Sequence, residues 1–224
     1  MTILALEFSS GRRSVAVARW RAGDASLAAS EVVETGAGGT RALGMIEDAL
    51  REAGLEREEI EVIAVGLGPG SHTGIRVALS VAQGWQLASP NHGVKLLGVS
   101  SAECVAAQAR AEKIFGRVNA VMDAQRNELY LAAYEISAAG WKETGPPRIV
   151  TRAEVESLAD ANEPLIGPEV TRWFPNGRTV FPRAAVLGRL ALSRSDYAAG
   201  DKLEPIYLRE TNFVKAPPSR RIAT

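Results

Sequence analysis

The amino-acid sequence predicts an α/β protein made of two similar lobes, each a mixed sheet flanked by helices. Strand-like apolar runs come first and then alternate with segments of helical spacing, which is typical of a mixed sheet covered by helices. There is also an internal similarity, because residues 118–135 can be laid beside residues 3–20. In both segments an apolar strand ends at a carboxylate, which a polar turn and a second strand follow. We therefore expect an N-terminal lobe at residues 1–112 and a C-terminal lobe at residues 113–224.

The first lobe begins with apolar runs that end at turn-forming residues, a pattern that favours strands. Strands are expected at residues 2–8, 14–20, 27–33, 61–67 and 94–99. Helical spacing begins at Thr40, which we assign as the N-cap, and ends at Gly54. A second helix is expected at residues 74–88, and a third begins at Ser101.

The second lobe opens with two strands and continues with shorter elements. Residues 151–154 (TRAE) form a capping-box pattern that begins a short helix. Further along the chain we expect a strand and turn at residues 164–170, a helix at 182–195 and an extended segment at 204–210. From Ala216 onward the chain is expected to be a loose tail.

Composition and charge exclude several functions. Lys plus Arg equals Asp plus Glu at 26 residues each, so no net positive field attracts nucleic acid to the isolated chain. The single cysteine, Cys104, cannot form an internal disulfide and fits a reducing compartment. The N-terminus reaches Glu7 too early for a signal peptide, and no apolar run approaches the length of a membrane span. We expect a cytoplasmic protein without a membrane segment.

A glycine-rich loop, within residues 65–84 (VGLGPGSHTGIRVALSVAQG), leads from a strand into the second helix. It does not match the Walker pattern, because Gly74 is followed by Ile75 rather than lysine. The dinucleotide pattern fails as well, since Ser71 and Thr73 stand where its last glycine would fall. Ser71 or Thr73 is expected to cap the helix. Two interpretations stay open: a turn required by packing, and a turn whose N–H groups face an anion.

Two helices carry more apolar surface than one sheet contact requires. In the first helix, the residues expected to cover the sheet are Leu43, Ile46, Leu50 and Ala53, and Met45 lies at the margin of this stripe beside Ala49. The second helix has an apolar arc of roughly 220°. This arc predicts either burial between the sheet and a neighbouring helix or a surface for a partner protein. The residues assigned to a partner interface are Met45, Ala49, Ile75, Ala78, Leu79 and Ala82.

Residues of the kinds that carry catalysis are few. The two histidines, His72 and His92, do not have the spacing of metal ligands, and no GxSxG motif is present. Glu7 and Asp123, each at a strand end, form the best acidic pair and could hold Mg²⁺ against a phosphate. Alternatively they are ordinary solvated carboxylates. We predict no catalytic residue, no metal ligand and no cofactor.

Four segments together resemble the TsaB family, also called YeaZ. They are ILALE near the start, GLGPGSHTGIRVALSVAQG, MDAQRNELYLAAY in the middle and PIYLRE near the end, in that order over nearly the whole chain. The resemblance implies a two-lobed fold of the actin/sugar-kinase/Hsp70 (RNase H-like) type. It also implies a part in making N6-threonylcarbamoyladenosine at position 37 of tRNA. In that family the protein is a non-catalytic subunit, which binds the catalytic relative TsaD.

The resemblance also implies the other partners of the complex. The ATPase TsaE joins TsaB and TsaD, TsaC supplies threonylcarbamoyl-adenylate, and tRNA is bound only through the complex. In the absence of TsaD, we expect the apolar face left open on the two helices to pair two copies of the chain as a homodimer. TsaD proteins carry a His pair at HxxxH spacing, which this chain lacks.

The chain departs from the usual start of the family. The family usually has IDT where this sequence has Glu7, Phe8 and Ser9. The vestigial phosphate or metal region therefore comprises Glu7, Ser9, Gly70, Thr73 and Asp123. The alternative function is an autonomous small-molecule kinase or ATPase of the same fold, which would use Glu7 and Asp123 around Mg²⁺.

Overall fold

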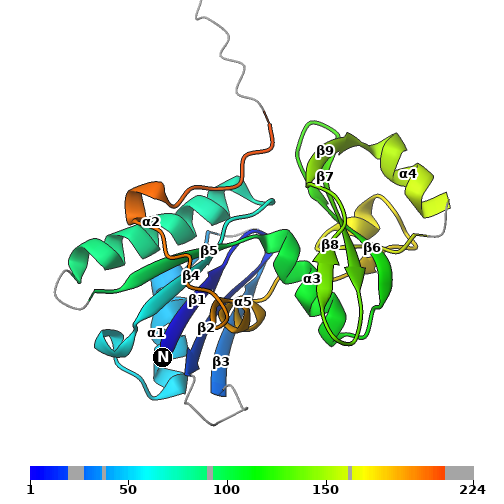
Figure 1. Cartoon of the computed structure of the whole chain (residues 1–224). Helices are drawn as coiled ribbons and strands as arrows, with labels where there is room; N and C mark the ends of the chain where they lie inside the picture. The colour runs from blue at the N-terminus through cyan, green and yellow to red at the C-terminus, as the bar shows by residue number, and fades with distance from the viewer. Residues whose placement is uncertain (20–27, 37–38, 90–92, 161–162, 210–224) are drawn as a thin grey trace, which may run out of the picture.

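The computed structural model describes residues 1–19, 28–36, 39–89, 93–160 and 163–209. The chain forms two lobes, each with its own sheet (Figure 1). The expected tail from Ala216 and the histidine His92 lie outside the described residues. No helix in the described ranges is both long enough and apolar enough to span a membrane.

The first sheet has the strand order β3-β2-β1-β4-β5. Its strands are β1 (Thr2–Glu7), β2 (Arg12–Arg19), β3 (Ala28–Thr35), β4 (Val62–Gly66) and β5 (Lys95–Val99). The first three strands pair antiparallel, whereas β1, β4 and β5 run parallel to one another. The five strands expected in this part of the sequence are therefore confirmed.

Helices cover both faces of the first sheet. On one face lie α1 (Ala42–Ala53) and α2 (His72–Ala88), which pack on Leu4, Leu6 and alternating residues of the neighbouring strands. On the other face, α5 (Ala184–Ala191) packs on Ile3, Ala5 and their neighbours. Because strand side chains alternate between faces, the continuous apolar run of β1 supplies both cores.

The second sheet repeats the arrangement of the first. Its strand order is β11-β10-β6-β7-β8, with β9 also paired to β7. Its strands are β6 (Gly116–Asp123), β7 (Glu128–Ile136), β8 (Trp141–Glu143), β9 (Arg148–Thr151), β10 (Leu165–Gly167) and β11 (Arg178–Thr179). As in the first lobe, the central strand β6 pairs antiparallel with the next strand and parallel with β10. The prediction of two similar lobes with mixed sheets is confirmed.

Helix α3 (Ser101–Ala111) lies between the two lobes. Its Val105 and Ala109 pack in the core of the second sheet, whereas Cys104 and Ala107 pack with α5 and the first sheet. Helix α5 follows the second sheet in the sequence but packs on the first, so the first lobe is not one stretch of chain. The boundary between residues 112 and 113 stays a proposal. The structure does correct the expected position of α5, which packs in the first lobe although its sequence lies in the range expected for the second.

Several helix ends are set by the capping residues expected from the sequence. Gly54 ends α1 in the left-handed conformation, and Ser71 caps α2 by accepting a hydrogen bond from the Gly74 N–H. The assignment of Thr40 as a cap is wrong, because α1 begins after Arg41, which makes no side-chain capping bond. Helix α4 (Arg152–Asp160) begins with the expected capping box between Thr151 and Glu154.

Three short 3₁₀ helices complete the described elements. They are η1 (Arg57–Glu59), η2 (Val170–Arg172) and η3 (Gly200–Lys202). After η3 the chain continues without helix or strand to a bend at Arg209, and the extended segment expected at residues 204–210 stays a prediction.

Candidate functional site

The glycine-rich loop packs directly on the turn between β1 and β2. The Ser71 N–H donates to the Ser9 carbonyl oxygen at 2.7 Å. A Cβ atom at Gly70 would overlap that same carbonyl oxygen, and one at Gly74 would overlap the carbonyl oxygen of Phe8. Both overlaps are with backbone, which cannot swing aside as a side chain can. Packing alone therefore requires glycine at these two positions, which supports the structural interpretation of the loop.

Glu7 lies at the end of β1 and is 0% exposed. Its carboxylate accepts hydrogen bonds from the Ser9 N–H at 2.9 Å and from the Ser101 hydroxyl at 3.0 Å. Ser101 in turn accepts from the Gly68 N–H, which links the carboxylate to the glycine-rich loop. Burial raises the pKa of Glu7, and the hydrogen bonds from Ser9 and Ser101 offset part of that rise. The interpretation of Glu7 as a solvated carboxylate is wrong, because it is a buried structural acid.

A cleft lies between the lobes, at the carboxyl ends of the central strands. Four residues of the vestigial region line it: Ser9, Gly70, Thr73 and Asp123. Glu7 is not among the lining residues, because its side chain points into the core. Asp123 is half-buried and accepts a hydrogen bond from the Gln125 N–H at 2.7 Å. Of the two acids of the proposed magnesium pair, only Asp123 therefore lines this cleft, and the kinase alternative lacks Glu7 as its second metal-binding carboxylate.

Other residues of the cleft were not predicted from the sequence. They are Ser10, Gly11, Ser71, His72, Ala124, Gln125, Arg126, Tyr130, Glu169, Arg172, Tyr207 and Arg209. Many of them follow directly after β1, β6 or β10, and the positions after parallel strands are where α/β folds place ligands. Applied to the predicted strands, this rule could have indicated these residues from the sequence.

The cleft carries charges of both signs. Arg126 and Arg172 are exposed along it and supply the positive charge. Glu169 is an acidic residue of the cleft. Burial raises the pKa of its carboxyl group, although a hydrogen bond from the Gly11 N–H offsets part of that rise. Within the described ranges there is no group of three or more His, Cys, Asp or Glu residues that could hold a metal ion. The geometry thus gives a polar cleft with mixed charge.

The six residues assigned to a partner interface all lie in the protein's own core. Their exposed fractions are 0% for Met45, Ala49, Ala78 and Ala82, 3% for Ile75 and 5% for Leu79. The interpretation of Met45 as marginal to the core is wrong, because α1 turns Met45 and Ala49 toward the sheet. A charge at Met45 would unfold the lobe instead of reporting on a contact.

The exposed apolar surface of these helices lies beside the assigned residues. Leu43, expected to face the sheet, is 65% exposed. It borders a groove between α1 and α2, whose lining residues are Leu43, Ile46, Glu47, Leu50, Arg57, Ser80, Val81, Gly84 and Trp85. The guanidinium of Arg57 lies 4.5 Å from the centre of the Trp85 ring at one side of the groove. Most of the apolar arc of α2 is thus buried in the protein's own core, and the part of α2 that stays open lines this groove at Val81 and Gly84.

Two lobes with the same strand order and a cleft between them define the actin/sugar-kinase/Hsp70 (RNase H-like) class of folds. The solved structure described as YeaZ from Pseudomonas aeruginosa superposes with a TM-score of 0.74 and 28% sequence identity, covering 92% of this chain and 99% of that one. The sequence model of the family "TsaD: tRNA N6-adenosine threonylcarbamoyltransferase" matches residues 39–208.

Curated relatives narrow the family further. "tRNA threonylcarbamoyladenosine biosynthesis protein TsaB" of Escherichia coli is 27% identical over 197 residues, which is 80% of this chain and 84% of the relative. The protein of the same name from Bacillus subtilis is 27% identical over 169 residues, which is 74% of this chain and 69% of the relative. This chain belongs to the TsaB/YeaZ family.

Proposed function

We propose that the protein is a non-catalytic subunit that binds and activates TsaD in the N6-threonylcarbamoyladenosine modification of tRNA position 37. The observation that carries this proposal is the similarity to TsaB proteins over most of both chains. TsaE is the further partner, tRNA binds only through the complex, and the assembly works in the cytoplasm. The balanced charge of 26 basic and 26 acidic residues agrees with weak binding of tRNA by this chain alone.

The state of Glu7 supports a non-catalytic role. Phosphoryl transfer requires a carboxylate that can reach a metal ion beside the phosphate. Here both oxygens of the Glu7 carboxylate accept hydrogen bonds from Ser9 and Ser101 inside the core. A cation could reach them only if those bonds broke. We therefore expect the purified protein to hydrolyse neither ATP nor peptides above background.

The groove between α1 and α2 is the proposed contact surface for TsaD. Leu43 and Val81 face it, and Gly84 lets another backbone approach closely because it has no side chain. Exposed apolar surface between two helices is what a second pair of helices would cover. In the absence of TsaD, the same surface would pair two copies of this chain, and TsaD would replace the homodimer by a heterodimer.

The decisive experiment is reconstitution with TsaD, TsaE and TsaC of the same organism. Threonylcarbamoylation of tRNA should depend on this protein. Equal product without it would refute the proposed role.

A pair of leucine variants tests the contact surface. Leu43→Glu places a charge in the groove and should weaken the association with TsaD at least tenfold, while Leu43 is exposed enough for the fold to remain. The matched control is Leu87→Glu, because Leu87 is 82% exposed on α2 but does not line the groove. Titration calorimetry should separate the two variants. Equal binding by both would place the interface elsewhere.

A further inference from the structure

The last described residues of the chain run from one lobe to the other. Leu203 is buried in the core of the first lobe, where Gly98 leaves room for it. The Ile206 N–H then donates to the Leu67 carbonyl oxygen at 2.9 Å, at the start of the glycine-rich loop. In Figure 1 this orange segment passes along α2 toward the second lobe. We call residues 203–209 the strap.

The middle of the strap is held on the first two turns of α2. The Tyr207 hydroxyl accepts a hydrogen bond from Arg76 at 3.2 Å. The Tyr207 ring also lies 6.0 Å from the ring of His72, measured between centroids. The contacts named so far all join the strap to the first lobe.

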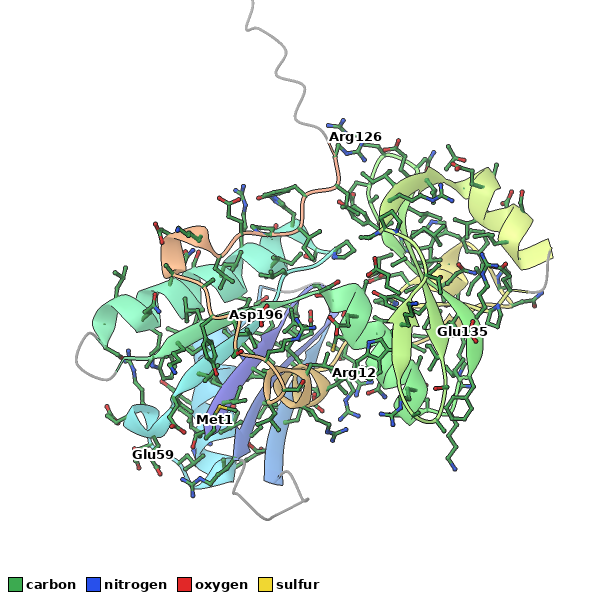
Figure 2. All side chains as sticks on the ribbon, viewed as in Figure 1. Met1, Arg12, Glu59, Arg126, Glu135 and Asp196 are labelled. Carbon is green, nitrogen blue, oxygen red and sulfur yellow. The ribbon has the colours of Figure 1, made fainter. Side chains whose placement is uncertain are left out.

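Arg209 makes the contact with the second lobe. Its guanidinium donates to the Ala124 carbonyl oxygen at 3.1 Å and lies 2.6 Å from the Glu128 carboxylate. Ala124 and Glu128 flank the loop that joins β6 to β7, so one side chain binds both ends of that loop. Figure 2 labels Arg126, from the same loop, beside the end of the strap.

The loop that Arg209 binds has an unfavourable backbone. Gln125, Arg126 and Asn127 all have positive φ values, of 63°, 57° and 62°. Side-chain-bearing residues rarely adopt this conformation, and three in succession persist only where the surroundings hold them. Asp123 holds the loop from β6 through the Gln125 N–H, and Arg209 holds it from the strap.

The strap and the loop both line the interlobe cleft. Tyr207 and Arg209 come from the strap, and Gln125 and Arg126 come from the loop. We propose that the strap fixes the width of the cleft between the lobes. The contacts of Arg209 with the loop of residues 124–127, which we call the latch, hold the strap in place. Since Arg209 and Glu128 are both about one-third exposed, the latch is weak enough to release without unfolding either lobe. This proposal does not depend on TsaD.

Distances between spin labels on the two lobes test the proposal in the full chain. Glu52→Cys on α1 and Glu135→Cys on β7 place labels on exposed positions, and the buried Cys104 stays unlabelled. Labelled protein is diluted with unlabelled protein, so that only distances within one chain are measured. We expect a narrow distance distribution that broadens toward longer distances in Arg209→Ala. Arg209→Lys keeps the charge and should fall between the two.

The matched control is Lys202→Ala, which removes one positive charge just before the strap at an exposed position. It should leave the distribution unchanged. Hydrogen exchange gives a second measurement, since the Glu128 N–H donates to Gln125 within the loop. That amide should exchange about threefold faster in Arg209→Ala while the melting temperature stays nearly constant. Equal distributions and equal exchange in Arg209→Ala and the parent protein, or equal broadening in Lys202→Ala, would overturn the proposal.

Discussion

The β1–β2 hairpin of the first lobe and the β6–β7 hairpin of the second have the same arrangement of strands, but the acids at their strand ends have different surroundings. Each central strand ends at an acid, Glu7 or Asp123, and a loop follows at once. Glu7 turns into the core and binds Ser9 and Ser101, whereas Asp123 stays at the cleft and binds its own loop. A shared strand order thus fixes where an acid lies but not whether water or a ligand can reach it.

The neighbouring parallel strands explain part of this difference. Both β4 and β10 end at a glycine, Gly66 or Gly167, beside the central strand. A Cβ atom at Gly66 would overlap the Glu7 carboxylate, so this glycine makes the pocket for a side chain. A Cβ atom at Gly167 would overlap the Val121 carbonyl oxygen, so that glycine makes room for backbone.

The largest expected effect follows from Gly167. Gly167→Ala should destabilise the second lobe by about 3 kcal/mol, because the added methyl group meets backbone and the residue has a φ of 155°. Urea unfolding followed by hydrogen exchange in β6 measures it. Adding Val121→Ala should give no rescue, since the clash is with the main chain. A clear rescue would show that the side chain of Val121, not its backbone, sets the close approach.

Gly66→Ala should cost somewhat less, about 2 kcal/mol, because its clash is with a side chain. The double variant Glu7→Ala with Gly66→Ala should therefore lose less stability than the sum of the two single variants, by about 1 kcal/mol. A complete double-mutant cycle by urea unfolding gives the coupling energy. Strict additivity would mean that Gly66 is not the glycine that accommodates Glu7.

The buried acid also predicts how stability depends on pH. Burial raises the pKa of Glu7 above its ordinary value of 4.5, so folding favours the protonated form. The stability that this group contributes is fully present below pH 4.5 and is lost as the pH rises through the raised pKa. Glu7→Gln keeps an uncharged side chain at every pH. The variant should gain stability relative to the parent protein as the pH rises above 4.5 and through the raised pKa.

Unfolding free energies of both proteins across that range isolate Glu7, because all other titrating groups are common to the two. A constant difference between the two curves would mean that Glu7 has the same pKa in the folded and unfolded chains.

Much of the fold could be predicted from local sequence, and one error shows where local sequence is insufficient. Strand runs such as residues 2–8 are apolar throughout, and Ser71 and Gly54 mark helix ends by their own backbone chemistry. Helix α1, however, has two apolar stripes, one toward the sheet at Met45 and Ala49 and one toward the groove at Leu43. Helical periodicity alone does not say which stripe meets the sheet.

The candidate site depends on residues that are distant in the sequence. Glu7 is buried because Gly66 leaves space and Ser101 supplies a hydroxyl, at separations of 59 and 94 residues. Similarly, Arg209 reaches Ala124 across 85 residues. The return of α5 to the first sheet is another such long-range contact. No local pattern carries this information, so the sequence indicated four residues that line the cleft but not the cleft itself or the rest of its lining.

The smallest expected effects compare the helix caps of the two lobes. In the second lobe, Thr151 and Glu154 cap α4 reciprocally: the Thr151 N–H donates to Glu154 at 2.8 Å, and the Glu154 N–H donates to the Thr151 hydroxyl at 3.4 Å. In the first lobe, Ser71 makes a single 3.3 Å bond to Gly74 at the start of α2. Thr151→Ala should therefore cost about 1 kcal/mol and Ser71→Ala about 0.5 kcal/mol. Because the two sites lie in different lobes, hydrogen exchange of amides in α4 and in α2 should report each loss separately. A larger loss for Ser71→Ala would mean that its hydroxyl also holds the glycine-rich loop in place, in which case amide exchange at Ser71, bonded to Ser9, should rise as well.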